Sequence, residues 1–213
     1  MTDRYPGYNV MDKRDTPSWN ELTRKVIDER LATPNTPTYL SDQEWQTLNA
    51  ICNRIAPQTS HRAAVPVAAL VQQKLADDKR DGHRQGSLPP LREAWRRGLA
   101  TLDAAARTGH DMRFCELDTT VQDQLLHAMQ DGELTDLELG DMPAEAFFKE
   151  RLAHDILAAY YSHPTSWNEI GFGGPASPRG YVRMYFNRRD PWEAVEDKSG
   201  QTAEVTRDNK HVR

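Results

Sequence analysis

The sequence predicts an all-α protein, a single irregular bundle of about six helices with a long Gly- and Pro-rich loop near the C-terminus and extended arms at both ends. Three observations predict this fold. Helix-start signals recur along the chain, apolar residues repeat every three or four positions, and strand signals are scarce. Only residues 181–186 could form a short strand, and they could equally form a helical turn.

The first helix is predicted to begin near Thr16 and Pro17. Ser18 and Glu21 have the spacing of a capping box, in which each residue's side chain caps the backbone of the other. The helix would carry one apolar face, made of Trp19, Leu22, Val26 and Leu31.

The second helix has the clearer start. Ser41 precedes Glu44 by three positions, again a capping box, and Leu40 can pack against Trp45. Its apolar face is Trp45, Leu48, Ile51, Cys52 and Ile55, and Pro57 ends it. Since Cys52 is in phase with this face, we expect a buried thiol rather than a reactive one, and Cys115 has no metal-ligand spacing to it.

The remaining helices follow prolines or precede glycines. Pro66, Pro90 and Pro143 each mark a predicted start, and Gly109 is expected to end the helix that begins at Pro90. A further helix is predicted over residues 119–130, with Gly132 beyond its end. The apolar stripes are Val67, Leu70, Val71 and Leu75; Leu91, Trp95, Leu99 and Leu102; Val121, Leu125, Leu126 and Met129; and Phe147, Phe148, Leu152, Ile156 and Tyr160.

Composition suggests three regions. Residues 1–15 form an extended polar arm, residues 16–192 the helical domain, and residues 193–213 a charged tail that we expect to be flexible. A length of 213 residues suits one such domain.

Charge and hydropathy exclude several classes of function. The net charge of −5 and the pI of about 5.8 provide no electrostatic footprint for nucleic acid. No apolar run of eighteen residues predicts a membrane span. The first residues, "MTDRYPGYNVMDKRD", have no apolar core typical of a signal peptide.

Catalytic patterns are weak. Gly171, Gly173 and Ala176 match a loose dinucleotide fingerprint, but that motif needs a strand before it and a helix after it, and here Pro175 and Pro178 disfavour such a helix. His163 and Glu169 could pair as base and orienting group, as residues of any exposed loop can. The alternative that stays open is a stand-alone metal-dependent phosphohydrolase of the HD type, whose candidate ligands are His127, His154, Asp155 and Asp190.

The most unusual stretch is "YYSHPTSWNEIGFGGPASPRGYVR". Seven of the seventeen residues from Pro164 to Gly180 are Gly or Pro, yet the stretch also carries aromatic residues and arginines. Such a loop is ordered only by packing on a large surface, either of its own domain or of a partner. Aromatic residues and Arg commonly anchor interfaces, which favours a partner somewhat. The candidate partner-binding residues are Trp167, Asn168, Glu169, Gly171, Phe172, Gly173, Gly174, Arg179, Tyr181 and Arg183.

We assign these candidates different roles. The aromatic residues and Arg179 would be the anchors, Asn168 and Glu169 would bind backbone or cap the loop, and the glycines would permit close approach. The arm, with its tyrosines, has a similar character and could also wrap a partner.

This stretch strongly resembles the C-terminal signature of the gluconate 2-dehydrogenase subunit 3 family. The "RIAP" of Arg54 to Pro57, followed by "VPVAALV", also looks like that family's early helices, so the resemblance covers roughly Leu40 to Trp192. It implies the small subunit of a sugar or sugar-acid dehydrogenase. The large partner would be a flavoprotein of the glucose-methanol-choline oxidoreductase class that holds the FAD and the catalytic histidine, and a cytochrome c subunit often completes the complex.

The resemblance therefore implies a non-catalytic subunit with no cofactor of its own that binds and stabilises its flavoprotein. Many relatives begin with a twin-arginine export signal, which "MTDRYPGYNVMDKRD" does not contain. We therefore expect a cytoplasmic protein, or a periplasmic one if the partner carries the export signal. A general helical adaptor for some other partner is the third hypothesis.

Overall fold

The computed structural model describes residues 3–58, 62–79, 82, 86–134, 138–181, 192–198 and 200–211. Within these residues the regular structure is helical, and extended backbone pairs only at one isolated bridge between Trp19 and Ser177. The all-α prediction is confirmed, and the number of helices roughly matches it. The segment considered as a strand lies, beyond Tyr181, outside the described residues. No described helix is long and apolar enough to cross a membrane.

Contacts divide the chain into two compact units. Unit 1 comprises Met1–Thr33, Thr59–Val65 and Tyr161–Arg213, and unit 2 comprises Pro34–Gln58 and Pro66–Tyr160. Both terminal segments, residues 1–15 and 193–213, fall in unit 1.

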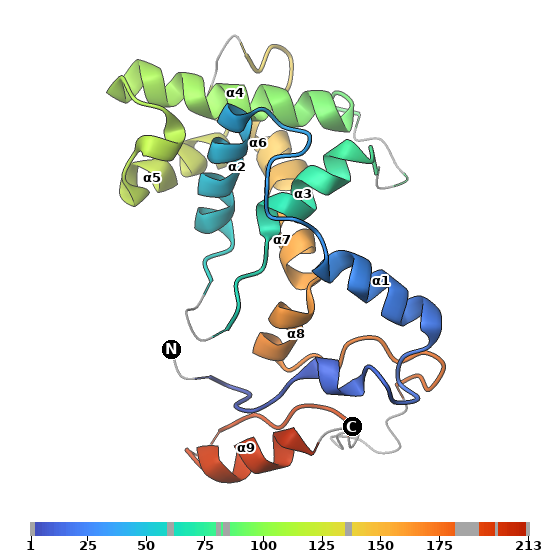
Figure 1. Ribbon diagram of the computed structural model, residues 1–213. Helices are drawn as coiled ribbons and strands as arrows, with labels where there is room; N and C mark the ends of the chain where they lie inside the picture. The colour runs from blue at the N-terminus through green and yellow to red at the C-terminus, as the bar shows by residue number, and fades with distance from the viewer. Residues whose placement is uncertain are drawn as a thin grey trace. The chain divides into compact units, whose positions relative to one another are not determined.

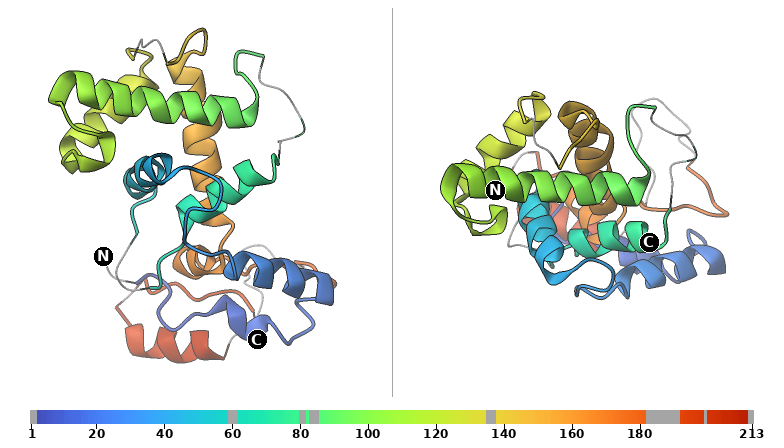
Figure 2. Two further views of the ribbon diagram at one scale, coloured as in Figure 1. Left: turned by 45° about the horizontal axis from the view of Figure 1, so that its top comes forward. Right: turned by 90° about the horizontal axis from the view of Figure 1, so that it is seen from above.

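Unit 2 is built around its longest helix. Its elements are α2 (Asp42–Ile55), α3 (Val67–Ala76), α4 (Leu91–His110), η2 (Phe114–Glu116), α5 (Thr119–Gln130), α6 (Ala144–Phe147), η3 (Phe148–Ala153) and most of α7 (His154–Tyr161). The long helix α4 contacts α2, α5 and α6 and runs crosswise over the unit (Figures 1 and 2).

The start of α2 agrees with the prediction. The Oγ of Ser41 accepts from the Glu44 N–H at 3.3 Å, and a Glu44 carboxylate oxygen accepts from the Ser41 N–H at 2.9 Å. Leu48 and Cys52 on its apolar face are buried, and burial raises the pKa of the Cys52 thiol. The expected burial of the thiol is confirmed.

The end of α4 differs from the prediction. Gly109 lies inside the helix, which continues to His110 and ends where Asp111 adopts a left-handed conformation with φ of 53°. A glycine with ordinary helical dihedrals does not stop a helix; the left-handed residue does. Trp95 and Leu102 are fully buried, as expected from the apolar stripe.

The helix predicted from Pro143 to Tyr160 contains a π-helical stretch, η3, between α6 and α7. Phe147 and Leu152 are both buried although five positions separate them, a spacing that an ideal α-helix places on different faces. The wider π turn brings the two side chains back toward one face. From Leu152 on, Ile156 and Tyr160 occur at the regular spacing of four and are buried.

Unit 1 collects segments that lie far apart in sequence. Its elements are η1 (Val10–Lys13), α1 (Glu21–Leu31), α8 (Pro164–Ile170) and α9 (Thr202–Lys210). The N-terminal segment runs between α8 and the C-terminal segment that carries α9 (Figure 1). The hydrophobic core consists of Tyr8, Val10, Trp19, Ile27, Trp167 and Ala194.

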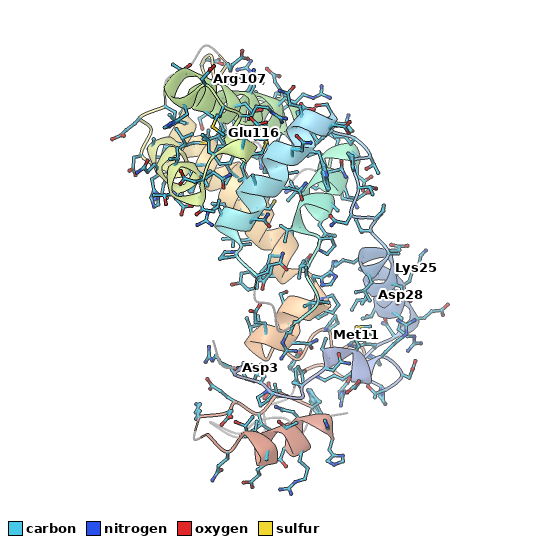
Figure 3. The ribbon with its side chains drawn as sticks, turned by 60° about the vertical axis from the view of Figure 1, so that its left-hand side comes forward. Asp3, Met11, Lys25, Asp28, Arg107 and Glu116 are labelled. Atoms are coloured by element: carbon cyan, nitrogen blue, oxygen red, sulfur yellow. The ribbon has the colours of Figure 1, made fainter. Side chains whose placement is uncertain are left out.

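The first helix begins later than predicted. Asn20, not Ser18, is the N-cap of α1, because its Oδ1 accepts from the Thr23 N–H at 2.8 Å. Trp19 therefore lies outside the helix and enters the core of unit 1. The expected apolar face of α1 is exposed, with Leu22 at 69%, and Ile27 is its buried residue. Lys25 and Asp28 extend from α1 in Figure 3.

The C-terminal segment contains a helix, which differs from the flexible tail that composition predicts. Asn209 of α9 is 1% exposed, and its side chain bonds three backbone groups: Val195 N–H, Val195 C=O and Pro6 C=O. The N-terminal arm is likewise fastened, since Arg62 pairs with Asp3 at 2.9 Å. A few specific side-chain contacts hold both polar segments in place. The average composition of these segments predicts flexibility because it does not reveal such contacts.

The close approach of α4 to the helix carrying Phe147 generates a prediction. A Cβ on Gly98 would lie 2.1 Å from the Phe147 ring, so Gly98→Ala should lower the free energy of unfolding by about 1–3 kcal/mol through overpacking. Gly109→Ala in the same helix meets nothing within 4 Å and should raise it by up to about 1 kcal/mol. Urea unfolding followed by circular dichroism measures both; equal effects of the two substitutions would contradict the proposed packing.

Candidate partner-binding surface

The first part of the Gly- and Pro-rich stretch is a helix rather than a loop. His163 is the N-cap of α8, its Nδ1 accepting from the Thr165 N–H at 3.2 Å, and Pro164 occupies the first helical position. Burial, and after it the charge of Arg30, lowers the pKa of His163. His163 therefore serves as the cap of α8, in place of the pairing with Glu169 considered from the sequence.

Trp167, a predicted anchor, lies inside unit 1. Its side chain is 5% exposed, packs with Tyr8, Val10 and Trp19, and donates from Nε1 to the Tyr161 carbonyl at 2.6 Å. Trp167 is thus a buried core residue on which the loop packs, and its side chain is not available on the surface.

Phe172 and Tyr181 form an exposed aromatic pair, and Phe172 packs on Trp167. The ring of Phe172 meets Trp167 edge-on at 5.8 Å and stacks on Tyr181 at 6.4 Å. Phe172 is nevertheless 45% exposed and Tyr181 43%, with Ile170 close to Phe172 in sequence at 46%. We call these three residues, Ile170, Phe172 and Tyr181, the loop face.

Three glycines shape the backbone under the loop face. Gly171 ends α8 with a φ of +69°, and a Cβ there would lie 2.4 Å from the ring of Tyr5. Gly174 has a φ of +68°, and a Cβ on it would lie 2.8 Å from Val10. Gly173 lies so close to Tyr181 that a Cβ would be 2.7 Å from the hydroxyl. These glycines allow the backbone to lie close to the N-terminal segment and to Tyr181.

The remaining predicted residues divide by environment. Asn168 accepts the Val10 N–H of its own chain at 2.7 Å through Oδ1, and Glu169 is half-buried on α8. The guanidinium of Arg179 lies 3.9 Å from the ring centroid of Trp192. Arg183 lies outside the described residues.

The N-terminal segment holds the loop, a role that the sequence alone does not assign to it. Lys13 is 1% exposed and donates from Nζ to the Gly173 carbonyl at 2.8 Å. The backbones of Ser18 and Asn20 bind the backbone of Ser177 at 2.8 Å each. In the sequence, the one indication of this role is the presence of Tyr5, Tyr8 and Val10 in an otherwise polar arm.

The candidate metal ligands of unit 2 have other roles. Asp155 is buried and accepts from Lys74 Nζ and from Trp95 Nε1, each at 2.8 Å. The side chain of His154 is 54% exposed, and the Nδ1 of His127 lies 2.7 Å from a backbone carbonyl oxygen of its own helix. Among the described residues no group of three His, Cys, Asp or Glu side chains could hold a metal ion, and Asp190 lies outside them.

The contact between Gly171 and Tyr5 yields a paired prediction. Gly171→Ala combines a left-handed φ with a clash against Tyr5, whereas Gly180→Ala has the same kind of φ, +73°, and open space. We expect Gly180→Ala to cost about 1–2 kcal/mol and Gly171→Ala about 1–3 kcal/mol more. Denaturant unfolding compares them, and equal losses would show that the arm does not press on Gly171.

Burial of Lys13 predicts a pH dependence of stability. Desolvation, and next the charge of Arg179, lowers the pKa of Lys13 to about 8, with Glu193 opposing the shift. Between about pH 8 and pH 10 the unfolded chain keeps a proton that the folded chain releases, so stability rises with pH in this window. Lys13→Met should remove this rise, whereas Lys25→Met, on the exposed side of α1, should retain it. Unfolding free energies at both ends of the window measure it, and an unchanged slope in Lys13→Met would refute the assignment.

Comparison with known proteins identifies a family for residues 42–174. No curated protein and no solved structure matches it. The family described as gluconate 2-dehydrogenase subunit 3 matches residues 42–174, which is more than half of the 213 residues and includes α8 and the first part of the loop. The family that the loop sequence resembles is thereby confirmed: this chain belongs to the gluconate 2-dehydrogenase subunit 3 family.

Proposed function

We propose that this chain is the non-catalytic small subunit of a dehydrogenase complex and that it binds and stabilises an FAD-containing large subunit of the glucose-methanol-choline class. Membership of a family of dehydrogenase subunits supports association with a large subunit. The large subunit would hold the FAD and the catalytic residues and would oxidise a sugar, a polyol or a sugar acid. A cytochrome c subunit as electron acceptor belongs to the same proposal.

The exposed loop face carries the proposal. Two stacked aromatic rings and Ile170 expose between 43% and 46% of their surfaces, although the backbone beneath them is tied down by hydrogen bonds. Exposed apolar clusters on an ordered backbone are typical of sites that bind another protein. Aromatic rings with polar neighbours are also the side chains that most often dominate binding energy.

The rigid loop supports tight binding for a physical reason. Hydrogen bonds from Lys13 and to Asn168 hold the backbone in one conformation before any partner arrives, so less conformational entropy is lost on association. A chain that binds only the folded large subunit stabilises it by mass action, by about 2.7 kcal/mol at a hundredfold excess over Kd.

Phe172→Ala tests this function. The ring is exposed, so the substitution should leave helix content unchanged and weaken binding of the large subunit about 10-fold or more. Met112→Ala, which truncates a similarly exposed side chain (43%) in unit 2, is the matched control and should bind normally. The measurement is the amount of flavin that co-purifies per mole of this chain, together with the Kd of the reconstituted pair.

Trp167→Ala separates docking from folding. Because Trp167 belongs to the core of unit 1, its truncation should destabilise that unit by about 3–5 kcal/mol, whereas Phe172→Ala should not. A Phe172→Ala chain that retains as much flavoprotein as the wild type would rule out the loop face as the docking surface.

A further inference from the structure

His163 fastens the first turn of α8 through two of its groups. Its backbone carbonyl accepts from the Ser166 N–H at 3.1 Å and from the Ser166 hydroxyl at 2.7 Å. Its imidazole is 5% exposed, and Nδ1 lies 3.2 Å from the backbone nitrogen of Thr165. A backbone N–H can only donate, so Nδ1 must be the acceptor. Since a protonated imidazole carries an N–H on both nitrogens, this cap exists only while His163 is neutral.

The surroundings of His163 oppose a positive charge on its ring. Burial deprives the charged form of hydration. The guanidinium of Arg30, on α1, donates to the carbonyl of the preceding residue, Ser162, which holds a second positive charge nearby. The free N–H groups of the first turn of α8 also present the positive end of the helix dipole. Desolvation, and after it the charge of Arg30, accordingly lowers the pKa of His163.

Other charged side chains of the elements around α8 lie toward different groups. They belong to η1, to the segment after residue 192 and to α8 itself, and they are Asp12, Lys13, Glu193 and Glu169. The ammonium of Lys13 donates to the Gly173 carbonyl beyond the far end of α8, and the carboxylate of Glu193 acts on that ammonium. Asp12 accepts from the Asn9 amide at 3.1 Å, and Glu169 lies in the last turn of α8. Within the described residues, Arg30 is thus the charge that acts on His163.

The cap of α8 bears on the loop face because of what α8 carries. A helix of seven residues is not stable by itself and needs both its cap and its tertiary contacts. Trp167 of α8 lies in the core of unit 1 and meets the ring of Phe172 edge-on. Asn168, the next residue, accepts the Val10 N–H of the N-terminal segment. Loss of the cap would loosen the turn from which both of these contacts are made.

We propose that protonation of His163 in mild acid uncaps α8, loosens the loop face and thereby weakens binding of the large subunit. The loosening of α8 concerns this chain alone, whereas the change in binding rests on the proposed function.

Linkage gives the direction of the effect. The ordinary pKa of a histidine is about 6.5, and that of His163 in the folded chain is lower. As the pH falls below about 6.5, the unfolded chain therefore binds a proton that the folded chain does not. The folded state loses stability through this window, by up to about tenfold in the unfolding equilibrium constant per pH unit, until the folded pKa is reached.

Two substitutions in the full chain imitate the two states of the cap. His163→Asn keeps a side-chain acceptor at the N-cap but cannot be protonated, whereas His163→Ala has no acceptor at any pH. The measurement is the amide protection factor of residues 165–170 by NMR hydrogen exchange, from about pH 7.5 to about pH 4.5. In the wild type these factors should fall by about 2- to 30-fold toward acid, the effect of losing an N-cap. They should stay high in His163→Asn and be low throughout in His163→Ala.

His127→Asn is the matched control, because His127 is an exposed histidine on α5 of unit 2 and should not affect the response of α8. An acid-dependent loss of protection that persists in His163→Asn would overturn the switch. So would a wild-type chain whose protection in residues 165–170 does not change with pH while that of His163→Ala is low.

A second arm measures binding. The Kd of the large subunit is determined across the same pH range for the wild type and for His163→Asn, and their ratio removes the pH dependence of the large subunit itself. The wild type should bind about 2- to 30-fold more weakly than His163→Asn in acid. A ratio that does not change with pH would overturn the effect on binding. Failure of both chains to bind any large subunit would instead overturn the proposed function, and hydrogen exchange would still decide whether protonation uncaps α8.

Discussion

The packing of Trp167 against the N-terminal segment is the constraint on which unit 1 depends. Its indole belongs to one core cluster with Tyr8, Val10 and Trp19, about 150 positions away in sequence, and it meets the ring of Phe172 edge to face. Without this contact neither η1 nor the segment after α8 would have an apolar surface to lie on, because α8 itself has only seven residues. The order of the loop face thus depends on long-range burial as well as on the glycine turns of the loop itself.

Unit 2 differs from unit 1 in how completely its polar groups are paired. The buried carboxylate of Asp155 receives an ammonium and an indole N–H, and the Thr47 hydroxyl donates to Asp103 at 3.1 Å. Most of the buried unpaired side-chain atoms in the described chain belong instead to unit 1, among them those of Tyr8, Trp19 and Arg179. The described polar groups of unit 2 are largely satisfied, whereas several buried donors of unit 1 have no acceptor among the described residues.

The division also explains which elements the sequence predicts. Capping boxes and three-to-four-residue periodicity are local, so α2, α4 and α5 are predictable within a residue or two at most ends. The core of unit 1 is not periodic. Trp19 is in phase with Leu22 and Val26, which predicts a helical position for it. Asn20, however, caps α1, so the helix begins after Trp19. The π turn at η3 and the helix α9 are not predictable from local pattern because each depends on a few buried contacts, of Phe147 and of Asn209.

The family match ends at Gly174, and this limit separates two contributions to recognition. Trp167 and Phe172 lie inside the matched segment, whereas Lys13, Arg179 and Tyr181 lie outside it. Apolar rings provide contact area to many partners, whereas charged side chains favour partners of the opposite charge. Trp167, which supports the exposed ring of Phe172, thus lies within the matched segment, while Tyr181, which stacks on that ring, lies beyond it.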